Sequence, residues 1–318
     1  MKILVTGGAG RLGRSVLAAL LAAGHETVSL DRVEATGIAC RQVDVDLLDE
    51  AAVSAFVGAE HPDAIVHLAA IAVPFSAPEG DILNTNARLA FTVLDAARAN
   101  GIARVLAASS PTVLGYGAPT GWAPDYLPLD ERHPARPWNA YAASKLLVEN
   151  LVAMFARQDT RTVFGAFRPC FVLSPDEWAG APTQQGHTVV ERLTDPGLAA
   201  VSLFNYVDAR DAADFVLAWL ERAGPAENGE TFFVGAADAL ATEPLATLLP
   251  RFLPGSAVAA AGLPGDAPAF SSAKAADRLG WTPTRSWRTE LGDDQRALLA
   301  AADLTPSHPD PSPESSTP

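Results

Sequence analysis

Short apolar runs alternate with longer stretches of helical periodicity along the first half of the chain. A strand repeats its side-chain direction every two residues and a helix about every 3.6, so the two patterns predict alternating strands and helices. The expected strands are 2–6, 27–30, 38–43, 64–68, 104–109 and 162–168. The expected helices are 12–23, 49–57, 84–100 and 140–157. This order is typical of an α/β fold with a Rossmann-type, doubly wound parallel sheet.

The pattern becomes less regular after residue 175, where glycine and proline separate short segments. We expect residues 1–170 to form the sheet domain, and 171–303 to form mainly a smaller C-terminal lobe with some chain returning to the sheet domain. Residues 304–318 contain five prolines and four serines, which predicts a disordered tail. The connection 110–141 is long for a compact domain, and long ordered connections usually carry function.

The charge balance excludes whole classes of partner. Of the 318 residues, 48% are hydrophobic, and the formal net charge is −14. Such a field repels phosphate backbones and anionic lipid surfaces, so we expect neither nucleic acid nor membrane as a partner. Cys40 and Cys170 lack the number and spacing of a disulfide framework or a metal site, and glycines interrupt the segment that a signal peptide would need. We therefore expect a cytoplasmic protein without a metal.

A glycine-rich turn follows the first predicted strand and opens the first predicted helix. Gly7, Gly10 and Gly13 allow positive φ and close approach of the backbone to a pyrophosphate at the positive end of the helix. Asp31 ends the second strand, where a carboxylate accepts hydrogen bonds from ribose hydroxyls and repels a 2′-phosphate. We therefore expect NAD rather than NADP. Arg32 either pairs with a 2′-phosphate or is a solvated surface charge.

A second motif places tyrosine and lysine on one helical face. Tyr141 and Lys145 are four residues apart, hence one turn apart on the predicted helix. A phenol has a pKa of about 10, and a close cation makes it a better base near neutral pH. Ser110 follows the fifth strand, at the edge where ligands of open α/β sheets bind, so its hydroxyl can hold a substrate oxygen. The alternative is a half-buried tyrosine, a surface lysine and a serine that satisfies backbone groups.

Together with the run 67–70, these motifs resemble the extended short-chain dehydrogenase/reductase family, specifically its NAD-dependent epimerase/dehydratase group, over most of residues 1–215. Similar segments are Asp46-Leu47, Asn84-x-Asn86 at the start of a helix, Phe167-Arg168-Pro169, Tyr206-Val207-Asp208 with Asp211, and Leu279-Gly280-Trp281-x-Pro283. The resemblance implies that the cofactor is bound by Gly7, Gly10, Arg11, Leu12, Gly13, Asp31, Arg32, Asp46, Leu47, Leu68, Ala69, Ala70, Asn86, Tyr141, Lys145 and Pro169.

The resemblance also implies the roles of the catalytic residues. Tyr141 exchanges a proton with the substrate oxygen while a hydride moves to or from the nicotinamide, Lys145 also holds the ribose, and Ser110 orients the oxygen. Members of the family often form homodimers, and the helices 84–100 and 140–157 would then pack into a four-helix bundle.

Four positions depart from well-known branches of the family. Dehydratases carry an Asp-Glu pair after the active-site threonine, but this chain has Pro111 and Thr112, so elimination lacks its carboxylates. Sugar 4-epimerases bind UDP phosphates with an asparagine and an arginine, whereas the corresponding positions here are Phe171 and Phe204. An apolar side chain does not bind a pyrophosphate.

Three functions remain open at this point. The first is an NAD-dependent oxidoreductase that acts on a secondary alcohol or ketone of a sugar-like or small polar substrate. The second is a nucleotide-sugar epimerase that retains its cofactor, in which Arg192 or Arg210 would bind the phosphates from another direction. The third is a non-catalytic dinucleotide sensor, against which the intact Ser110, Tyr141 and Lys145 argue.

Aromatic and charged side chains complete the set of candidates. The tryptophans that would either stack on a substrate ring or pack in the core are Trp122, Trp138 and Trp178. The side chains of the long connection that we expect to be solvated are Asp130, Glu131 and His133. His67 ends the fourth strand without a metal-ligand partner in the sequence, so we expect a structural role.

Overall fold

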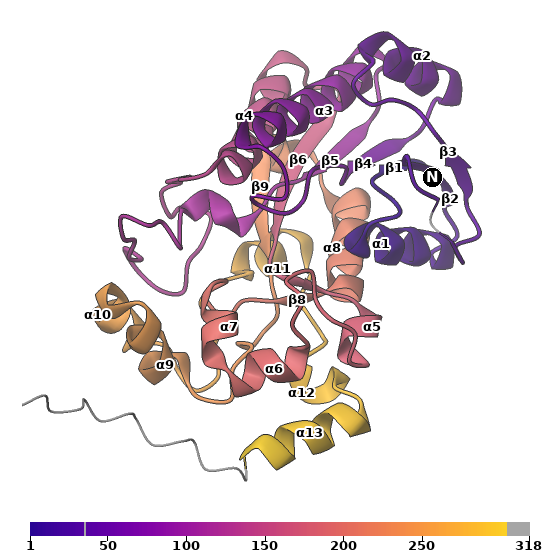
Figure 1. Ribbon diagram of the computed structural model, residues 1–318. Coiled ribbons are helices and arrows are strands. Elements are labelled where there is room, and N and C mark those ends of the chain that lie inside the picture. The colour runs from indigo at the N-terminus through magenta and orange to yellow at the C-terminus, as the bar shows by residue number, and fades with distance from the viewer. Residues whose placement is uncertain (35, 304–318) are drawn as a thin grey trace, which may run out of the picture.

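The computed structural model describes residues 1–34 and 36–303, and its centre is a seven-stranded parallel sheet (Figure 1). The strands are β1 (Lys2–Thr6), β2 (Glu26–Leu30), β3 (Arg41–Val43), β4 (Ala64–His67), β5 (Arg104–Ala108), β6 (Val163–Pro169) and β9 (Glu230–Val234). The predicted Rossmann-type sheet is confirmed. The predicted tail, 304–318, lies outside the described residues.

The strand order is β3-β2-β1-β4-β5-β6-β9, so the chain builds outward from β1 in both directions. Thr6 at the end of β1 lies between Leu30 of β2 and His67 of β4. The direction of winding reverses between β1 and β4, and open α/β sheets bind ligands at such a point, beyond the carboxyl ends of the strands. The third strand is shorter than predicted, because residues 38–40 do not pair with β2.

Helices cover both faces of the sheet (Figure 1). On one face lie α2 (Glu50–Glu60), α3 (Glu79–Ala99) and α4 (Ala140–Gln158), and on the other α1 (Arg11–Ala22) and α8 (Ala209–Arg222). Helix α3 begins five residues before the predicted start, with acidic residues in its first turn, where they suit the positive end of the helix. Asn84 and Asn86 therefore lie inside α3, and the prediction that they open it was wrong.

The remaining segments gather mainly beneath the carboxyl ends of the strands (Figure 1). They are the paired strands β7 (Val172–Leu173) and β8 (Val207–Asp208), the helices α5 (Pro175–Trp178), α6 (Val189–Thr194), α7 (Pro196–Ala200), α9 (Leu245–Phe252), α10 (Ala257–Ala260), α11 (Ala273–Leu279), α12 (Trp287–Glu290) and α13 (Asp293–Asp303), and the 3₁₀ turns η1 (Pro111–Leu114), η2 (Pro225–Glu227) and η3 (Pro254–Ser256). No helix in the described part of the chain is long and apolar enough to cross a membrane.

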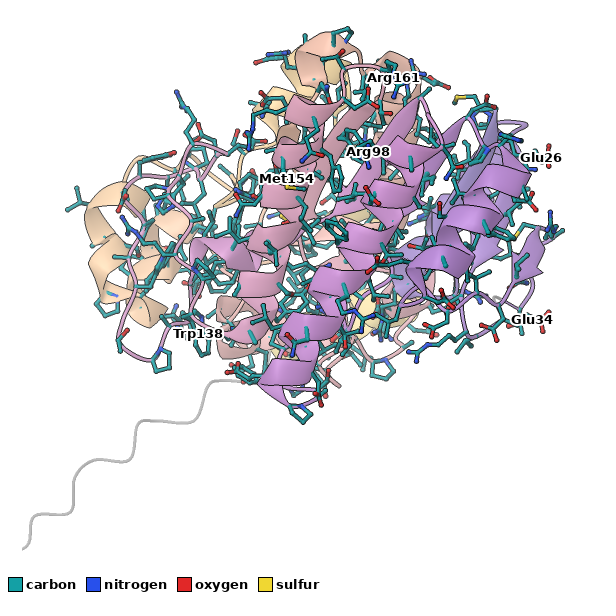
Figure 2. The ribbon with its side chains drawn as sticks, turned by 90° about the horizontal axis from the view of Figure 1, so that it is seen from above. Glu26, Glu34, Arg98, Trp138, Met154 and Arg161 are labelled. Carbon is teal, nitrogen blue, oxygen red and sulfur yellow. The ribbon has the colours of Figure 1, made fainter. Side chains whose placement is uncertain are left out.

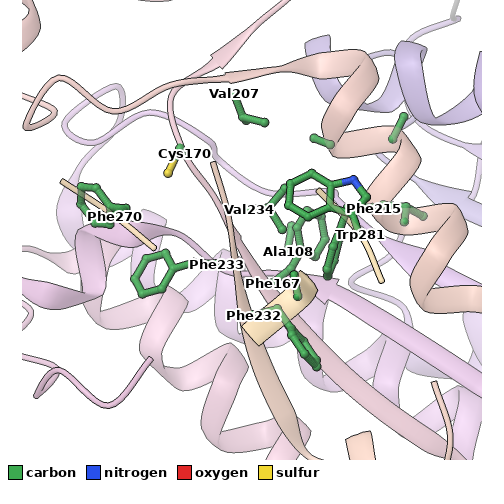
Figure 3. Close-up of a cluster of buried hydrophobic side chains, with 14 of the residues drawn as sticks. Ala108, Phe167, Cys170, Val207, Phe215, Phe232, Phe233, Val234, Phe270 and Trp281 are labelled. Carbon is green, nitrogen blue, oxygen red and sulfur yellow. The ribbon is translucent and has the colours of Figure 1, made fainter. Parts of the chain in front are cut away.

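An aromatic core joins the sheet to the C-terminal segments (Figure 3). The ring of Trp281 packs edge-on against Phe215 of α8 at 5.5 Å, and its Nε1–H donates to the Asp211 carbonyl at 3.1 Å. Burying a side chain such as that of Phe215 stabilises the fold by roughly 1.5–3 kcal/mol. The same cluster contains Cys170, whose thiol pKa is raised by burial. Two of the segments noted in the sequence, those around Asp211 and Trp281, thus meet in one packed junction.

Candidate active site

The glycine-rich turn lies at the end of β1, pressed against the segment that leaves β4. Gly7 has a φ of +75°, and a Cβ on it would lie 2.7 Å from the Ala69 nitrogen. A Cβ on Gly13 would lie 2.2 Å from the Gly7 carbonyl oxygen. Any larger residue at these two positions would push the turn away from β4 and α1. The glycines therefore fix a close approach of the turn to the neighbouring protein backbone.

A cleft of about 260 Å³ opens beside this turn, between the ends of β1, β2 and β4. Predicted cofactor residues that line it are Gly7, Gly10, Asp31, Arg32, Asp46, Leu47, Leu68, Ala69 and Ala70. It is also lined by Leu30, Val45, Leu48, Ile71, Ala72, Thr85 and Leu89. Predicted residues outside the lining are Arg11, Leu12, Gly13, Asn86, Tyr141, Lys145 and Pro169. The lining combines backbone N–H groups, apolar side chains and acidic groups, which suits the adenosine part of a dinucleotide.

Asp31 is held at the rim of this cleft by two backbone groups. The Ala9 N–H donates to Asp31 Oδ2 at 3.0 Å, and the Val33 N–H donates to Oδ1 at 3.2 Å. A carboxylate fixed in this way keeps acceptor capacity for hydroxyl groups that enter the cleft. Arg32 next to it is exposed to solvent.

His67 supports the cleft from below. Its Nδ1 lies 2.8 Å from the Thr6 hydroxyl, whose oxygen also accepts the N–H groups of Leu68 and Ala69. Burial, followed by the charge of Lys145, lowers the pKa of His67 to about 3, so the imidazole is neutral. The geometry agrees with the structural role expected for this histidine.

Asn86 connects the cleft to helix α4. Its Oδ1 accepts the Ile71 N–H at 2.8 Å, and its Nδ2 donates to the Ile71 carbonyl and the Ser144 hydroxyl, both at 3.1 Å. Ser144 in turn donates to the Tyr141 carbonyl at 2.7 Å. The Asn86 amide is thus committed to protein groups, and it holds the β4 segment against the helix that carries Tyr141.

Ser110, Tyr141 and Lys145 come together beyond the end of β5. Ser110 caps η1, its hydroxyl is hydrogen-bonded to the Tyr141 phenol, and Thr112 Oγ1 donates to it at 2.9 Å. Lys145 Nζ donates to the Ala108 carbonyl at 2.9 Å and lies 5.8 Å from the centre of the Tyr141 ring.

Burial dominates the titration of this group. It raises the pKa of Tyr141 to about 12, an effect that the Ser110 hydrogen bond opposes, and it lowers the pKa of Lys145 to about 8. A second positive charge next to the phenol would lower the pKa of Tyr141 and prepare it to accept a proton. The arrangement can therefore exchange a proton with a substrate oxygen once a cationic group lies beside it.

A buried ion pair behind the site was not predicted from the sequence. Arg168 donates from Nε and Nη2 to the two oxygens of Glu149, each at 2.7 Å, and Ser109 donates to Glu149 Oε1 at 2.5 Å. Strand β5, helix α4 and strand β6 are thereby locked together. The signal in the sequence is the charge of Arg168 in an otherwise apolar strand, because a buried guanidinium needs a partner.

The C-terminal segments contribute mostly apolar groups near the strand ends. Phe171 and Phe204 are both buried there. Asn205, which sequence reasoning missed, accepts the Phe171 N–H at 2.9 Å and is hydrogen-bonded to the phenol of Tyr116. Only its place beside the Tyr206 motif distinguishes Asn205 in the sequence.

The two arginines suggested for phosphate binding differ in their environment. Arg210 is paired with Asp208 and Glu290, each at 2.5 Å, so its charge is compensated within the protein. Arg192 is buried and forms no ion pair with a carboxylate of the described residues.

The three tryptophans also occupy different environments. The indole N–H of Trp178 donates to Asp208, and that of Trp122 donates to the Leu114 carbonyl, so both are packed within the protein. Trp138 is 38% exposed, and its ring lies 5.7 Å from that of Phe75. Of these three, Trp138 alone presents a substantial surface for stacking.

The expectation of solvated side chains in the long connection was wrong for two of the three residues. His133 is buried, and its Nε2 accepts the Asp125 N–H at 3.1 Å. Glu131 is partly buried and accepts the Phe233 N–H of β9 at 2.7 Å, and burial raises its pKa. Asp130 is partly exposed and binds Tyr126 and Arg132. The Glu131 contact anchors the connection to the sheet, and the others hold the connection together, which sequence spacing does not reveal.

The sequence is similar to those of known enzymes. The chain is 32% identical over 180 residues to the UDP-glucose 4-epimerase of Mus musculus, in a match that covers 50% of each protein. It spans about half the length of the UDP-glucose 4-epimerases that it matches. The 2-alkyl-3-oxoalkanoate reductase of Stenotrophomonas maltophilia is 29% identical over 303 residues, which are 90% of this chain and 83% of that protein.

Solved structures share the fold over nearly the whole length. A short-chain dehydrogenase/reductase superfamily protein from Agrobacterium tumefaciens with bound NAD has a TM-score of 0.68 at 26% identity, covering 95% of this chain and 97% of its own. A UDP-glucose 4-epimerase from Thermotoga maritima has a TM-score of 0.69 at 20% identity, covering 96% and 100%. The model of the NAD-dependent epimerase/dehydratase family matches residues 3–235, so the resemblance inferred from the motifs is confirmed. The chain belongs to the NAD-dependent epimerase/dehydratase family.

Proposed function

We propose that this protein is an NAD-dependent oxidoreductase that moves a hydride between the nicotinamide and a secondary alcohol or ketone of a sugar-like or small polar substrate. The observation that carries the proposal is the contact of Ser110 with Tyr141, whose ring also faces Lys145. In the adjoining lobe, the buried side chains of Phe171 and Phe204 have no polar group that could bind a diphosphate. The similarity of 90% of the chain to a 2-alkyl-3-oxoalkanoate reductase points the same way.

The residues fit the cofactor that the family implies. The glycine-rich turn leaves its backbone open to a pyrophosphate, and the cleft beside it ends at the fixed carboxylate of Asp31. We therefore prefer NAD to NADP, and we assign the adenosine half to the cleft and the nicotinamide half to the side of Tyr141 and Lys145. NAD, when bound, accepts the hydride of an alcohol or, in reduced form, returns it to a ketone.

In this mechanism, Tyr141 takes the hydroxyl proton of the substrate during oxidation and returns it during reduction. Ser110 donates a hydrogen bond to the substrate oxygen and keeps it beside the phenol. Lys145 supports the phenolate electrostatically from the next helical turn. Residues 171–303 supply most of the substrate-binding lobe. Elimination of water is disfavoured, because Pro111 and Thr112 stand where dehydratases carry acidic residues.

A retained-cofactor sugar epimerase is the second candidate, favoured by the similarity of half the chain to UDP-glucose 4-epimerases. In an epimerase the hydride returns to the opposite face of the same carbon, so the cofactor stays bound through both halves. A non-catalytic sensor of dinucleotides is a lesser candidate, since a sensor does not need the Tyr141 and Lys145 pair.

Cofactor retention separates these candidates. We expect freshly purified protein to release little nicotinamide on denaturation, to bind added NAD, and to reduce it with an alcohol substrate. A near-stoichiometric release of NAD, with UDP-glucose converted to its 4-epimer and no net reduction, would instead establish the epimerase. Binding of NAD without turnover of any alcohol, ketone or nucleotide sugar would favour the sensor, and binding of neither NAD nor NADP would exclude all three.

We also propose a cytoplasmic homodimer. The side chains of Leu83 and Phe91 on α3 and of Leu147 on α4 are each more than one-third exposed, although all three are apolar. The two helices run side by side over one face of the molecule (Figure 2). Cys40 and Cys170 are free thiols, as expected in a reducing compartment. Sedimentation of the wild type and of a Phe91→Arg variant tests the dimer, since a charge in the shared face would dissociate it.

A further inference from the structure

A buried cation without a counter-ion lies in the C-terminal lobe. Arg192 of α6 has no exposed surface, and among the described residues only Arg168 is another buried arginine. Arg168 has Glu149, whereas Arg192 has no carboxylate within ion-pair distance among those residues. The acidic side chains of Glu191 and Asp195 are directed to backbone groups at Thr188 and Gly197.

The hydrogen bonds of Arg192 leave one donor of the buried guanidinium without a partner among the described residues. Nη1 donates to Gln185 at 2.5 Å and Nη2 donates to the Ser202 hydroxyl at 3.2 Å, while the buried Nε–H has no partner among the described residues. Burial lowers the pKa of Arg192 to about 10, with no nearby acid to compensate. The Nε and Nη2 groups form the side-on fork that binds a carboxylate with two parallel hydrogen bonds.

Arg192 packs against an aromatic ring and lies next to a segment with unusual backbone angles. The guanidinium carbon lies 4.2 Å from the centre of the Phe171 ring, a cation–π contact. Leu203 and Phe204 both have positive φ, of 52° and 58°, directly after the Ser202 that contacts the arginine. Two consecutive left-handed residues other than glycine are costly, and such strain is concentrated at ligand sites.

A set of contacts links Arg192 to the segments that follow β6 and precede β8. Phe171, which stacks with the arginine, donates its N–H to Asn205, and Asn205 is hydrogen-bonded to the phenol of Tyr116. The unpartnered Nε–H of Arg192 therefore belongs to a group of contacts with Phe171 and Asn205, which lie on the segments that follow β6 and precede β8.

We propose that Arg192 binds a carboxylate of the substrate, so that the enzyme acts on a hydroxy acid and the corresponding oxo acid. This inference rests on the proposed oxidoreductase function. Arg210, Arg285 and Arg288 of the same lobe are already paired with acidic side chains. One negative charge on the substrate would therefore be enough to compensate Arg192. One positive charge in a protein of net charge −14 suits a carboxylate rather than a diphosphate.

The test compares acids with neutral analogues in the full-length protein. NAD reduction is measured with 3-hydroxybutanoate and 3-hydroxyoctanoate beside their methyl esters, and with glucuronate beside glucose. The wild type should prefer at least one acid to its neutral analogue. Arg192→Met should reduce kcat/KM for that acid about 100-fold, because it removes one partner of a buried charge pair. The value of kcat/KM for the neutral analogue should change little. Arg192→Lys keeps the charge but not the fork, and should fall between them. Arg251→Met removes an exposed charge from the same lobe and should leave the preference unchanged.

Stability provides the second readout. A ligand-binding cation imposes a desolvation cost on the free protein, so Arg192→Met should melt at the same or a higher temperature than the wild type. A structural cation would instead make Arg192→Met melt lower, and that result would overturn the proposal. So would equal use of the acid and its neutral analogue by the wild type.

The binding arm distinguishes failure of this inference from failure of the proposed function. If NAD binds and no compound is oxidised, the oxidoreductase proposal fails. An acid that still raises the melting temperature of the wild-type NAD complex, but not of the Arg192→Met complex, supports the carboxylate site. If no acid in the set does so, and none is oxidised in preference to its neutral analogue, the inference is wrong.

Discussion

Arg168 and Arg192 are both buried, but one lies in the sheet and the other in the C-terminal lobe. Arg168 is held by a bidentate pair with Glu149 and lies over the ring of Phe233. Arg192 lies over a ring as well, yet no carboxylate of the described residues pairs with it. A charge that the fold compensates serves to position other groups, whereas a charge left open marks a place where a ligand completes the structure.

The largest expected effect comes from Tyr141 and tests whether the sheet domain carries out the proton transfer. Tyr141→Phe removes the proton-exchanging hydroxyl but keeps the ring, so turnover should fall roughly 1000-fold for acid and neutral substrates alike. Affinity for NADH should change little. Steady-state kinetics and a fluorescence titration of NADH measure the two quantities.

Tyr126→Phe is the matched control, because it removes a phenol hydroxyl that donates to Asp130 within the long connection. It should leave turnover within about two-fold. Full activity of Tyr141→Phe would show that another group exchanges the proton. The sheet domain would then no longer be assigned the proton transfer.

The two arginines should also differ in their effect on stability. Arg168→Met leaves the Glu149 carboxylate buried and unpaired, which should lower the free energy of unfolding by about 3–5 kcal/mol. Arg192→Met leaves no buried charge behind and should not lower it. Urea denaturation followed by circular dichroism measures both variants.

Arg161→Met serves as the control for this pair, since Arg161 is largely exposed in its contact with Asp159. Its effect should stay below about 1 kcal/mol. If Arg168→Met and Arg192→Met were equally destabilising, both arginines would have a structural role, and Arg192 would not be distinguished as a ligand-binding residue.

Lys145 sharpens the comparison, because it is a buried cation in the sheet domain that also lacks a carboxylate partner among the described residues. Burial lowers its pKa from 10.5 to about 8. Below pH 8 the lysine is protonated in both states, and the folded protein bears the full cost of burying the charge. Between pH 8 and 10.5 the unfolded chain binds more protons, so this cost is relieved as the pH rises.

Lys145→Met should therefore be more stable than the wild type at pH 7, by up to about 3 kcal/mol, with the difference shrinking toward pH 10.5. Urea denaturation at pH 7 and pH 10 measures the change. Lys274→Met is the control, because Lys274 is paired with Glu230 and should show no such gain. A gain for Lys145→Met that does not depend on pH would assign the effect to packing rather than to charge.

The sheet domain was largely predictable because its function depends on local backbone patterns. The strand-turn-helix segment at Gly7 and the helical spacing of Tyr141 and Lys145 are short-range signals, and the structure brings Ser110 to them. The contacts that support them are long-range. Glu149 of α4 pairs with Arg168 of β6, and the spacing of the two residues in the sequence does not predict the pair.

The lobe was less predictable for a physical reason. Its segments are short, and their positions are set by side chains that meet across large sequence separations, such as Trp178 with Asp208 and Trp287 with Tyr206. The same reason applies to the burial of His133, which was expected to be solvated. Substrate recognition by Arg192 depends on which charge is left unpaired, and that is a property of the folded lobe alone.

The smallest expected effect concerns Asp31, the fixed negative charge that faces the cleft. Asp31→Asn keeps the shape of the side chain but removes the charge that would oppose a 2′-phosphate, while the exposed Arg32 remains beside it. The ratio of NADPH to NADH affinity should rise about ten-fold, measured by fluorescence titration. Glu34→Gln removes an exposed charge three residues away, outside the lining of the cleft, and should leave the ratio unchanged. An equal shift in both variants would assign the preference to the acidic field of the whole protein. A shift confined to Asp31→Asn would show that a single carboxylate held by two backbone N–H groups selects the cofactor, as Arg192 is proposed to select the substrate.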